Sequence, residues 1–164
     1  MDNEIGASFL SFSSAKLEHM MAFTRSCFER LSDEQVWQRQ GDYENSVGNL
    51  ILHLCGNMRQ WIMHGVGGAA DVRVREQEFS TDGGMSAKEL IRLFEETIAE
   101  ARGVIDSLPA ERLMERTTPQ GRDVSVLEAI YQVVGHVQLH TGQIILMTKQ
   151  MCSTDLDLTM PRPR

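Results

Sequence analysis

The chain has 164 residues, of which 41% are hydrophobic and 24% charged, and this composition suits a single globular domain with its own core. Its 23 acidic and 16 basic side chains give a formal net charge of −7, so we expect no interaction with nucleic acid or with an anionic membrane. No stretch approaches the roughly 20 apolar residues that a membrane span needs. The three cysteines have no CxxC spacing and the first residues lack the features of a signal peptide, and both observations predict a cytoplasmic protein with reduced thiols.

Apolar residues recur at helical spacing in four segments, which we predict to be the long helices of the domain. These segments comprise about residues 5–31, residues 45 or 46 to 64, residues 86–108 and residues 125–151. Ser86 with Glu89, and Ser125 with Glu128, have the spacing of a capping box and mark the start of the third and fourth helices. Four amphipathic helices with almost no sheet predict an all-α fold, a four-helix bundle that forms one domain over residues 1–164.

The segments between the helices carry weaker signals. Ser32 and Gln35 also have capping-box spacing and predict a short helical turn. Residues 65–84 contain two glycine-rich stretches around the charged segment DVRVREQEF, and they predict an irregular connection. Residues 117–126 place a PQG turn between β-branched residues, which predicts a small hairpin or an extended loop. Residues 153–164 have no periodic apolar stripe and predict a loose tail.

His136 and His140 are the first candidates for chemistry. Their spacing of four places both imidazoles on one face of the fourth predicted helix, one turn apart, where they can bind a single metal ion. That face is apolar and points toward the core, where histidines are costly unless they form hydrogen bonds or bind a metal. The alternative is a pair of core histidines that are hydrogen-bonded by a glutamine or by backbone. Val137 stands where an HExxH protease has its glutamate, so the pair brings no general base.

A metal ion needs a third ligand, and His53 in the second predicted helix is the best placed. If the second and fourth helices face each other, His53 comes to the level of the histidine pair. His64 shares a side of the helix with His53 but lies about 16 Å further along the axis, which suits a residue that caps the helix end. Cys55 points about 200° away from His53 around the helix, and Cys152 lies about 18 Å beyond His140, so we expect neither thiol to join the site.

The donor set itself favours one kind of chemistry. Three neutral imidazoles leave coordination positions open, as in catalytic sites, whereas structural zinc sites are closed by four protein ligands. An ion bound in this way lowers the pKa of a water molecule or holds a thiolate ready as a nucleophile. Imidazole ligands suit zinc, nickel, iron and copper.

The stretches NSVGNLILHLCGNMRQWI and HVQLHTGQIILMTKQ, in this order, resemble the DinB/YfiT-like superfamily, and RVREQEF resembles one uncharacterised branch of it. The resemblance covers the chain from about Phe12 to Met151. It implies a bundle with up-down-down-up topology and long connections, and a homodimer. It also implies one divalent ion on His53, His136 and His140, with zinc or nickel expected first and iron as another choice.

Characterised members of this superfamily include thiol S-transferases that use low-molecular-weight thiols, and a thiol-dependent isomerase. The resemblance therefore implies a metal-dependent enzyme in which a thiol or water attacks a small electrophilic substrate, as in a thiol transferase or a hydrolase. Two other interpretations stay open. One is a non-catalytic bundle whose ion ties two helices together, and the other is a dimeric interaction protein whose histidines are merely buried.

Five further polar residues lie near the predicted site or in the charged connection. Asn57 and Gln143 lie within one turn of the candidate ligands, where each can orient a histidine by a hydrogen bond or simply take part in polar packing. Arg73, Arg75 and Glu78 can line the mouth of a cavity or form a dimer contact, although a charged segment of this kind is usually solvated.

Overall fold

The computed structural model describes residues 2–39 and 41–158, and helices dominate this part of the chain. The α-helices of this part of the chain are α1 (Asp2–Phe28), α2 (Val47–Met58), α3 (Arg75–Ser80), α4 (Ala87–Asp106) and α5 (Val126–Cys152). Shorter elements join them, namely the 3₁₀ turns η1 (Gln35–Trp37), η3 (Ala110–Met114) and η4 (Pro119–Gly121), the π-helix η2 (Arg59–His64), and the strands β1 (Arg116–Thr117) and β2 (Val124–Ser125). The predicted all-α fold is confirmed.

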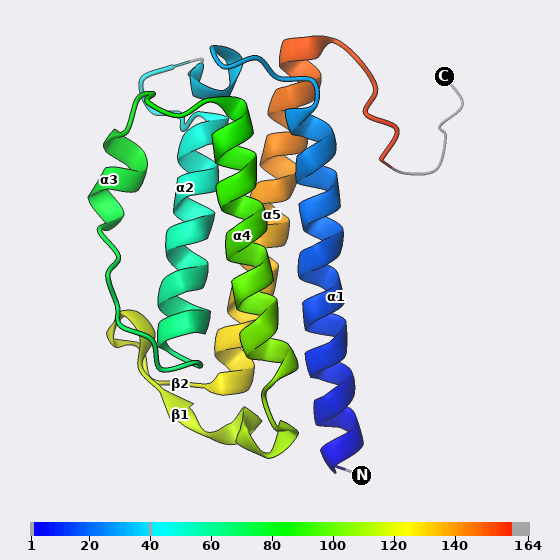
Figure 1. Ribbon diagram of the computed structural model, residues 1–164, viewed down its shortest axis with the longest axis vertical. Helices are drawn as coiled ribbons and strands as arrows, with labels where there is room; N and C mark the ends of the chain where they lie inside the picture. The colour runs from blue at the N-terminus through cyan, green and yellow to red at the C-terminus, as the bar shows by residue number, and fades with distance from the viewer. Residues whose placement is uncertain (1, 40, 159–164) are drawn as a thin grey trace.

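The helices α1, α2, α4 and α5 form a four-helix bundle, and Figure 1 shows its topology. From the N-terminus at the lower end, α1 runs upward, α2 and α4 both run downward, and α5 returns upward. Because α2 and α4 run in the same direction, the chain between them has to travel back along the bundle. This segment, residues 65–86, is called the crossover below, and it carries α3, which packs against α2.

The predicted apolar stripes form the core of the bundle. In α4 the buried stripe comprises Leu90, Phe94, Ile98, Ala101 and Ile105. In α1 it comprises Leu17, Met20, Met21, Thr24 and Phe28. The period of 3.6 residues therefore located the core-facing side of these helices correctly.

Capping boxes fix where three of the bundle helices begin. The predicted pairs Ser86–Glu89 and Ser125–Glu128 are both present, with each side chain accepting a hydrogen bond from the backbone of the other residue. A third capping box, which joins Ser46 to the Asn49 side chain, starts α2. These reciprocal bonds satisfy backbone N–H groups that have no partner inside the helix.

The crossover departs from the prediction of an irregular connection, because residues 75–80 form α3. This helix has no apolar stripe that a periodic pattern could reveal, and the residue that it buries is Glu78. The other connections follow the prediction. The strands β1 and β2 pair antiparallel, with Thr117 opposite Val124, and Ser32 and Gln35 exchange side-chain-to-backbone hydrogen bonds in a short turn.

The predicted loose tail covers residues 153–164, of which 159–164 lie outside the described residues. Ser153 ends α5 in the left-handed conformation, with φ of 50°. Three residues later, Leu156 is only 3% exposed and belongs to the hydrophobic core. The described part of the tail therefore folds back onto the bundle.

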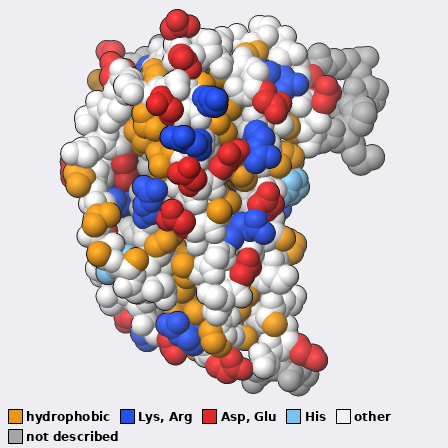
Figure 2. All heavy atoms as spheres, viewed as in Figure 1, with side chains coloured by type: hydrophobic (Ala, Val, Ile, Leu, Met, Phe, Trp, Pro, Cys, Tyr) orange, Lys and Arg blue, Asp and Glu red, His pale blue; other side chains and the backbone are white. Residues whose placement is uncertain are grey.

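The outer surface of α4 is strongly charged. Figure 2 shows acidic and basic side chains interspersed over the face that α4 occupies in this view. Arg25 Nε lies 2.8 Å from Glu95 Oε1 and joins α1 to α4, while Arg92 Nε lies 3.8 Å from Glu96 Oε1 within α4. Exposed pairs of this kind contribute less than about 1 kcal/mol each and keep the face hydrated. Within residues 2–39 and 41–158, no helix combines the length and the apolar character that crossing a membrane requires.

Candidate metal centre

The three predicted histidines come together between α2 and α5, two antiparallel helices that contact each other. His53 belongs to α2, and His136 and His140 lie one turn apart on α5. One ring nitrogen from each can be chosen so that all three lie within 4.8 Å of one another. The Nε2 atoms of His53 and His136 are 2.8 Å apart. Three imidazoles from two helices thus converge on one point.

Two of the three rings have a hydrogen-bond partner on the side away from this point. His53 Nδ1 lies 2.9 Å from Glu78 Oε2, and His140 Nδ1 lies 2.5 Å from Gln143 Oε1. Because both partners are oxygen acceptors, each Nδ1 is the nitrogen that carries the hydrogen. The Nε2 lone pairs of both rings are then free to face the cluster.

Glu78 is a buried carboxylate, with 7% of its surface exposed. Arg73 donates two hydrogen bonds to it, from Nε to Oε1 at 2.6 Å and from Nη2 to Oε2 at 2.8 Å. Arg73 also donates to Gln60 Oε1 at 3.0 Å, which ties the crossover to η2. Burial raises the pKa of Glu78, but the hydrogen bonds from Arg73 and His53 outweigh it and hold the pKa below its usual range. Glu78 is therefore an ionised acceptor at neutral pH.

The position of Glu78 depends on a glycine and an asparagine of α2. A Cβ added at Gly56 would lie 1.9 Å from Glu78 Oε1, so any larger residue would push the carboxylate away. Asn49 donates from Nδ2 to the backbone carbonyls of Glu78 and Thr81, at 3.0 and 2.8 Å. Polar contacts, rather than an apolar stripe, thus hold α3 on α2.

The environment keeps the α5 histidines neutral. Burial lowers the pKa of His136 to about 4, and the neighbouring His140, His53 and Arg73 add to this effect. Burial also lowers the pKa of His140, against the hydrogen bond to Gln143, which raises it. Neutral imidazoles are the form that binds a metal ion.

The other residues singled out in the sequence fall into place around this cluster. Gln143 makes the expected contact with His140, but Asn57 Oδ1 is buried without a hydrogen-bond partner among the described residues. Arg73 is not solvated as a charged loop usually is, because its side chain is 3% exposed. Arg75 is exposed, and its guanidinium lies 4.9 Å from the centre of the Phe79 ring.

The residues that the sequence excluded as ligands lie outside the cluster. His64 ends η2, and its Nδ1 lies 2.6 Å from the Ala69 carbonyl, so it holds the turn that follows and caps no carbonyl of its own helix. Cys55 is buried, with its Sγ directed at the Leu93 carbonyl of α4. Cys152 Sγ lies 3.3 Å from the Arg30 carbonyl, at the far end of α5.

Sequence reasoning proposed Glu78 for the mouth of a cavity or a dimer contact, but not as the partner of His53. Its segment shows only a mixture of charges, and the carboxylate reaches His53 because the crossover folds across α2. The signal that could have indicated it is the glycine three residues after His53, which leaves space on the same side of the helix.

A groove of about 430 Å³ has Gln143, the hydrogen-bond partner of His140, in its wall. It is lined by Tyr43, Glu44, Asn45, Leu50, Gln143, Leu146, Met147 and Gln150. His136 and His140 are partly exposed, in contrast to buried His53. The two α5 rings are therefore the partly solvent-exposed members of the cluster.

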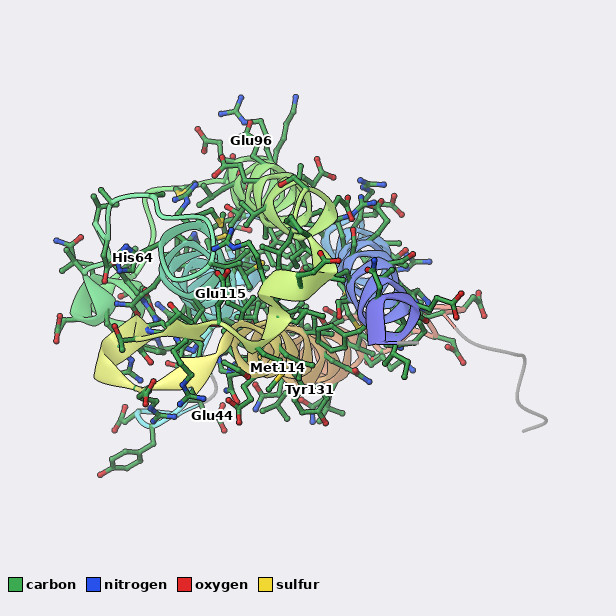
Figure 3. The ribbon with its side chains drawn as sticks, turned by 90° about the horizontal axis from the view of Figure 1, so that it is seen from below. Glu44, His64, Glu96, Met114, Glu115 and Tyr131 are labelled. Carbon is green, nitrogen blue, oxygen red and sulfur yellow. The ribbon has the colours of Figure 1, made fainter. Side chains whose placement is uncertain are left out.

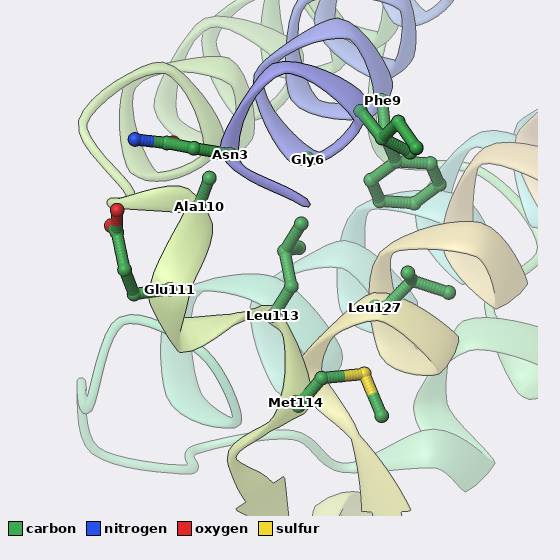
Figure 4. A pocket seen from close by; sticks show the side chains of 9 residues that line it. Asn3, Gly6, Phe9, Ala110, Glu111, Leu113, Met114 and Leu127 are labelled. Atoms are coloured by element: carbon green, nitrogen blue, oxygen red, sulfur yellow. The ribbon is translucent and has the colours of Figure 1, made fainter. Parts of the chain in front are cut away.

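A second hollow of about 460 Å³ lies at the lower end of the bundle, between the first turns of α1, η3 and the start of α5 (Figure 4). Its lining is Asn3, Ile5, Gly6, Phe9, Ala110, Glu111, Leu113, Met114 and Leu127. Figure 4 shows mostly apolar side chains around it, without a convergent set of polar groups. Its chemistry suits packing more than catalysis.

The donor set fits a divalent metal ion. The three candidate donors are imidazole nitrogens, the ligand type that zinc, nickel and iron accept. The outer nitrogens of His53 and His140 are engaged by a carboxylate and an amide, as is usual for histidines that bind metals. Asn57, one turn after His53, adds a buried oxygen without a partner among residues 2–39 and 41–158.

Together, the fold and the histidine cluster define a four-helix bundle with three histidines that could hold one metal ion. The crystal structure of a DinB-like protein from Bacillus cereus ATCC 10987 has the same fold, with a TM-score of 0.67 over 95% of each chain and 16% sequence identity. Residues 4–164 match the family described as "Protein of unknown function (DUF1572)", a DinB-like family, and the chain belongs to it. No curated protein matches the chain.

Proposed function

We propose that His53, His136 and His140 bind one divalent metal ion and that the protein is a metal-dependent enzyme. The observation that carries this proposal is the convergence of three imidazole nitrogens within 4.8 Å of one another. Zinc and nickel are the first candidates, and iron is a further one, because all three accept imidazole ligands. When bound, such an ion supplies a Lewis acid that lowers the pKa of a water molecule or a thiol.

The residues of the chain have defined tasks in this proposal. Glu78 and Gln143 hold two of the rings with their Nδ1–H groups turned outward. The groove beside Gln143, of about 430 Å³, has room for a small molecule. The substrate class is a small electrophile, attacked by a low-molecular-weight thiol or by water. Three protein ligands favour this proposal over a structural site, which would be closed by four.

Metal analysis tests the site. Purified protein without a tag is analysed by plasma mass spectrometry beside His136→Ala and the control His19→Ala, which removes an exposed histidine of α1. We expect about one equivalent of zinc, nickel or iron in the wild type and in the control, and its loss in His136→Ala. Wild-type protein that stays free of metal after each ion is added back would contradict the proposal. Thiol-transfer and hydrolysis assays on the loaded protein then distinguish an enzyme from a structural site.

We further propose that the protein is a homodimer that associates through the outer face of α5. Tyr131, Leu139 and Leu146 are 70%, 61% and 57% exposed on this face. Gly135 and Gly142 lie on it as well, and a Cβ added at either would meet open space. Glycine inside a helix costs about 1 kcal/mol relative to alanine. No close neighbour among the described residues requires a glycine at either position.

The charge pattern supports the same face. Between Glu128 and Lys149, α5 carries no acidic or basic residue apart from its two histidines. Figure 3 shows Tyr131 and Met114 on one side of the molecule and Glu96, on charged α4, on the opposite side. Two copies that each carry a net charge of −7 repel each other, so an uncharged face is where they can approach.

Sedimentation analysis tests the dimer. We expect a dimer for the wild type and for Val72→Glu, which places the same charge on an exposed part of the crossover. Leu139→Glu should give a monomer with an unchanged helical spectrum. A monomeric wild type would refute the dimer and leave the metal site unaffected.

A cytoplasmic location stays part of the proposal and is supported by three cysteines that are all free thiols.

A further inference from the structure

The attachment of α3 is unusual for so short a helix. It has six residues, and the side chain that it buries is a carboxylate. Burying a carboxylate is costly unless it is paired and hydrogen-bonded, and Glu78 is satisfied by Arg73 and by His53. A helix that only covered the bundle would dock at a lower cost in desolvation free energy through an apolar side chain.

The contact between Glu78 and His53 has a definite direction. Both oxygens of Glu78 accept hydrogen bonds from the Arg73 guanidinium, so the carboxyl group faces His53 as an acceptor and the 2.9 Å contact requires the hydrogen on His53 Nδ1. Arg73 Nη2 lies 3.2 Å from the same nitrogen, but it too is a donor and shares Glu78 Oε2 as its acceptor. With Nδ1 protonated, a neutral His53 presents its Nε2 lone pair toward His136, 2.8 Å away.

We propose that Glu78, held in place by Arg73 and by the space at Gly56, is a positioning residue that selects the Nδ1–H tautomer of His53. The crossover thereby prepares a ligand of the metal centre on α2. This inference rests on the proposed function for its purpose, but the tautomer can be measured without any metal. It also couples two events, because a residue that favours the metal-binding form of His53 is itself held more firmly once the metal is bound.

The tautomer is measured first, in metal-free protein at pH 8, from long-range proton–nitrogen NMR correlations of the His53 ring. We expect Nδ1 to carry the hydrogen in the wild type and in the control Glu76→Gln, which alters an exposed residue of α3. In Glu78→Ala the hydrogen should move to Nε2. Glu78→Gln should restore the wild-type tautomer, because its amide oxygen can still accept. Hydrogen on Nε2 in the wild type, or an unchanged spectrum in Glu78→Ala, would overturn the inference.

Metal affinity supplies the second readout, measured by competition between the protein and a chelator for cobalt or zinc. Glu78→Ala should bind about 10- to 100-fold more weakly than the wild type, and Glu78→Gln should fall between the two. Gly56→Ala should weaken binding similarly, since it displaces the carboxylate without removing it. Gly103→Ala is its control, because a Cβ at this position of α4 meets nothing within 4 Å. Alanine favours both helices, so a loss of affinity in Gly56→Ala alone is not a failure to fold.

The two proposals fail in different ways. If Glu78→Ala binds metal as tightly as the wild type, the positioning role is refuted while the metal site stands. If the wild type binds no metal, the proposed function is refuted, and the His53 tautomer still decides whether Glu78 positions this ring.

Discussion

The bundle has two sides that treat buried polar groups differently. On α1 and α4, the buried hydroxyls of Thr24 and Thr97 donate to the carbonyls of Met20 and Leu93, each four residues earlier in the same helix. The rest of the buried α4 stripe is apolar, and its exposure does not exceed 1% from Phe94 to Ile105. The buried threonines of this half are therefore satisfied within their own helices, as expected of a part that provides stability.

The half formed by α2, η2 and α5 is different. It contains the three histidines, and it also contains Asn57 Oδ1, Trp61 Nε1 and Thr141 Oγ1, the buried side-chain atoms that lack a hydrogen-bond partner in the described part of the chain. A buried polar atom without a partner costs about 1–3 kcal/mol. A bundle selected for stability alone would replace such residues, so this half is the one shaped by binding. The predictions below test that division, from the largest expected effect to the smallest.

The largest effect is expected from the apolar half. Phe94→Ala removes a fully buried ring of α4 and should lower the free energy of unfolding by about 3–5 kcal/mol. Chemical denaturation measures this loss. Below the unfolding transition, the affinity of the variant for zinc should equal that of the wild type, because the histidines lie on the other two helices. Weaker zinc binding in the folded variant would show that the two halves are not independent.

Removal of the metal should give the next largest effect. If the three histidines bind an ion present at 100 times its dissociation constant, a chelator should lower the free energy of unfolding by about 2.7 kcal/mol. Thermal melts with and without chelator measure the shift, and His136→Ala serves as the control that should show none. A wild-type protein that carries one equivalent of metal yet melts identically with chelator would place the ion elsewhere.

The sequence was sufficient to predict the four-helix fold because each long helix is amphipathic on its own. The stripe that contains Leu90 and Phe94 and the capping box at Ser86 are local signals, and both survive in the structure. The pairing of His136 with His140 is equally local, since a spacing of four fixes a shared helix face. Placing His53 beside them required only that α2 and α5 be neighbours.

Contacts made by the crossover could not be predicted in this way. The burial of Glu78 depends on a segment that folds back across α2, on the space at Gly56, and on Arg73, which lies five residues earlier in the chain. None of these three features leaves a periodic pattern in the sequence. Asn57 is the opposite case. Its sequence position suits a contact with a histidine, but its Oδ1 has no hydrogen-bond partner among the described residues.

Two threonines on α5 test whether the buried polar atoms without a partner lower the stability of the half formed by α2, η2 and α5. Thr141 Oγ1 is buried without a partner among the described residues, whereas Thr148 Oγ1 donates to the Ile144 carbonyl at 2.8 Å. Thr141→Val should therefore raise the free energy of unfolding by about 1 kcal/mol, and Thr148→Val should lower it by a similar amount. Denaturant titrations at equal slope measure both. Destabilisation of both variants alike would mean that Thr141 also has a partner in solution.

The smallest effect concerns a thiol in the α1 half. Burial raises the pKa of Cys27 above its ordinary value of 9.0, whereas the contact with Thr148 and nearby positive charges lower it. The folded state thus prefers the neutral thiol. This contribution to stability is complete below pH 9 and is lost as the pH rises through the folded pKa, because the unfolded thiol ionises first. At pH 9.5 the free energy of unfolding has fallen by less than about 1 kcal/mol, because ionisation of the thiol stabilises the unfolded state mainly at higher pH. Denaturation of the wild type and of Cys27→Ala between pH 7.5 and 9.5 measures the difference, and parallel pH profiles would show that the Cys27 thiol does not contribute.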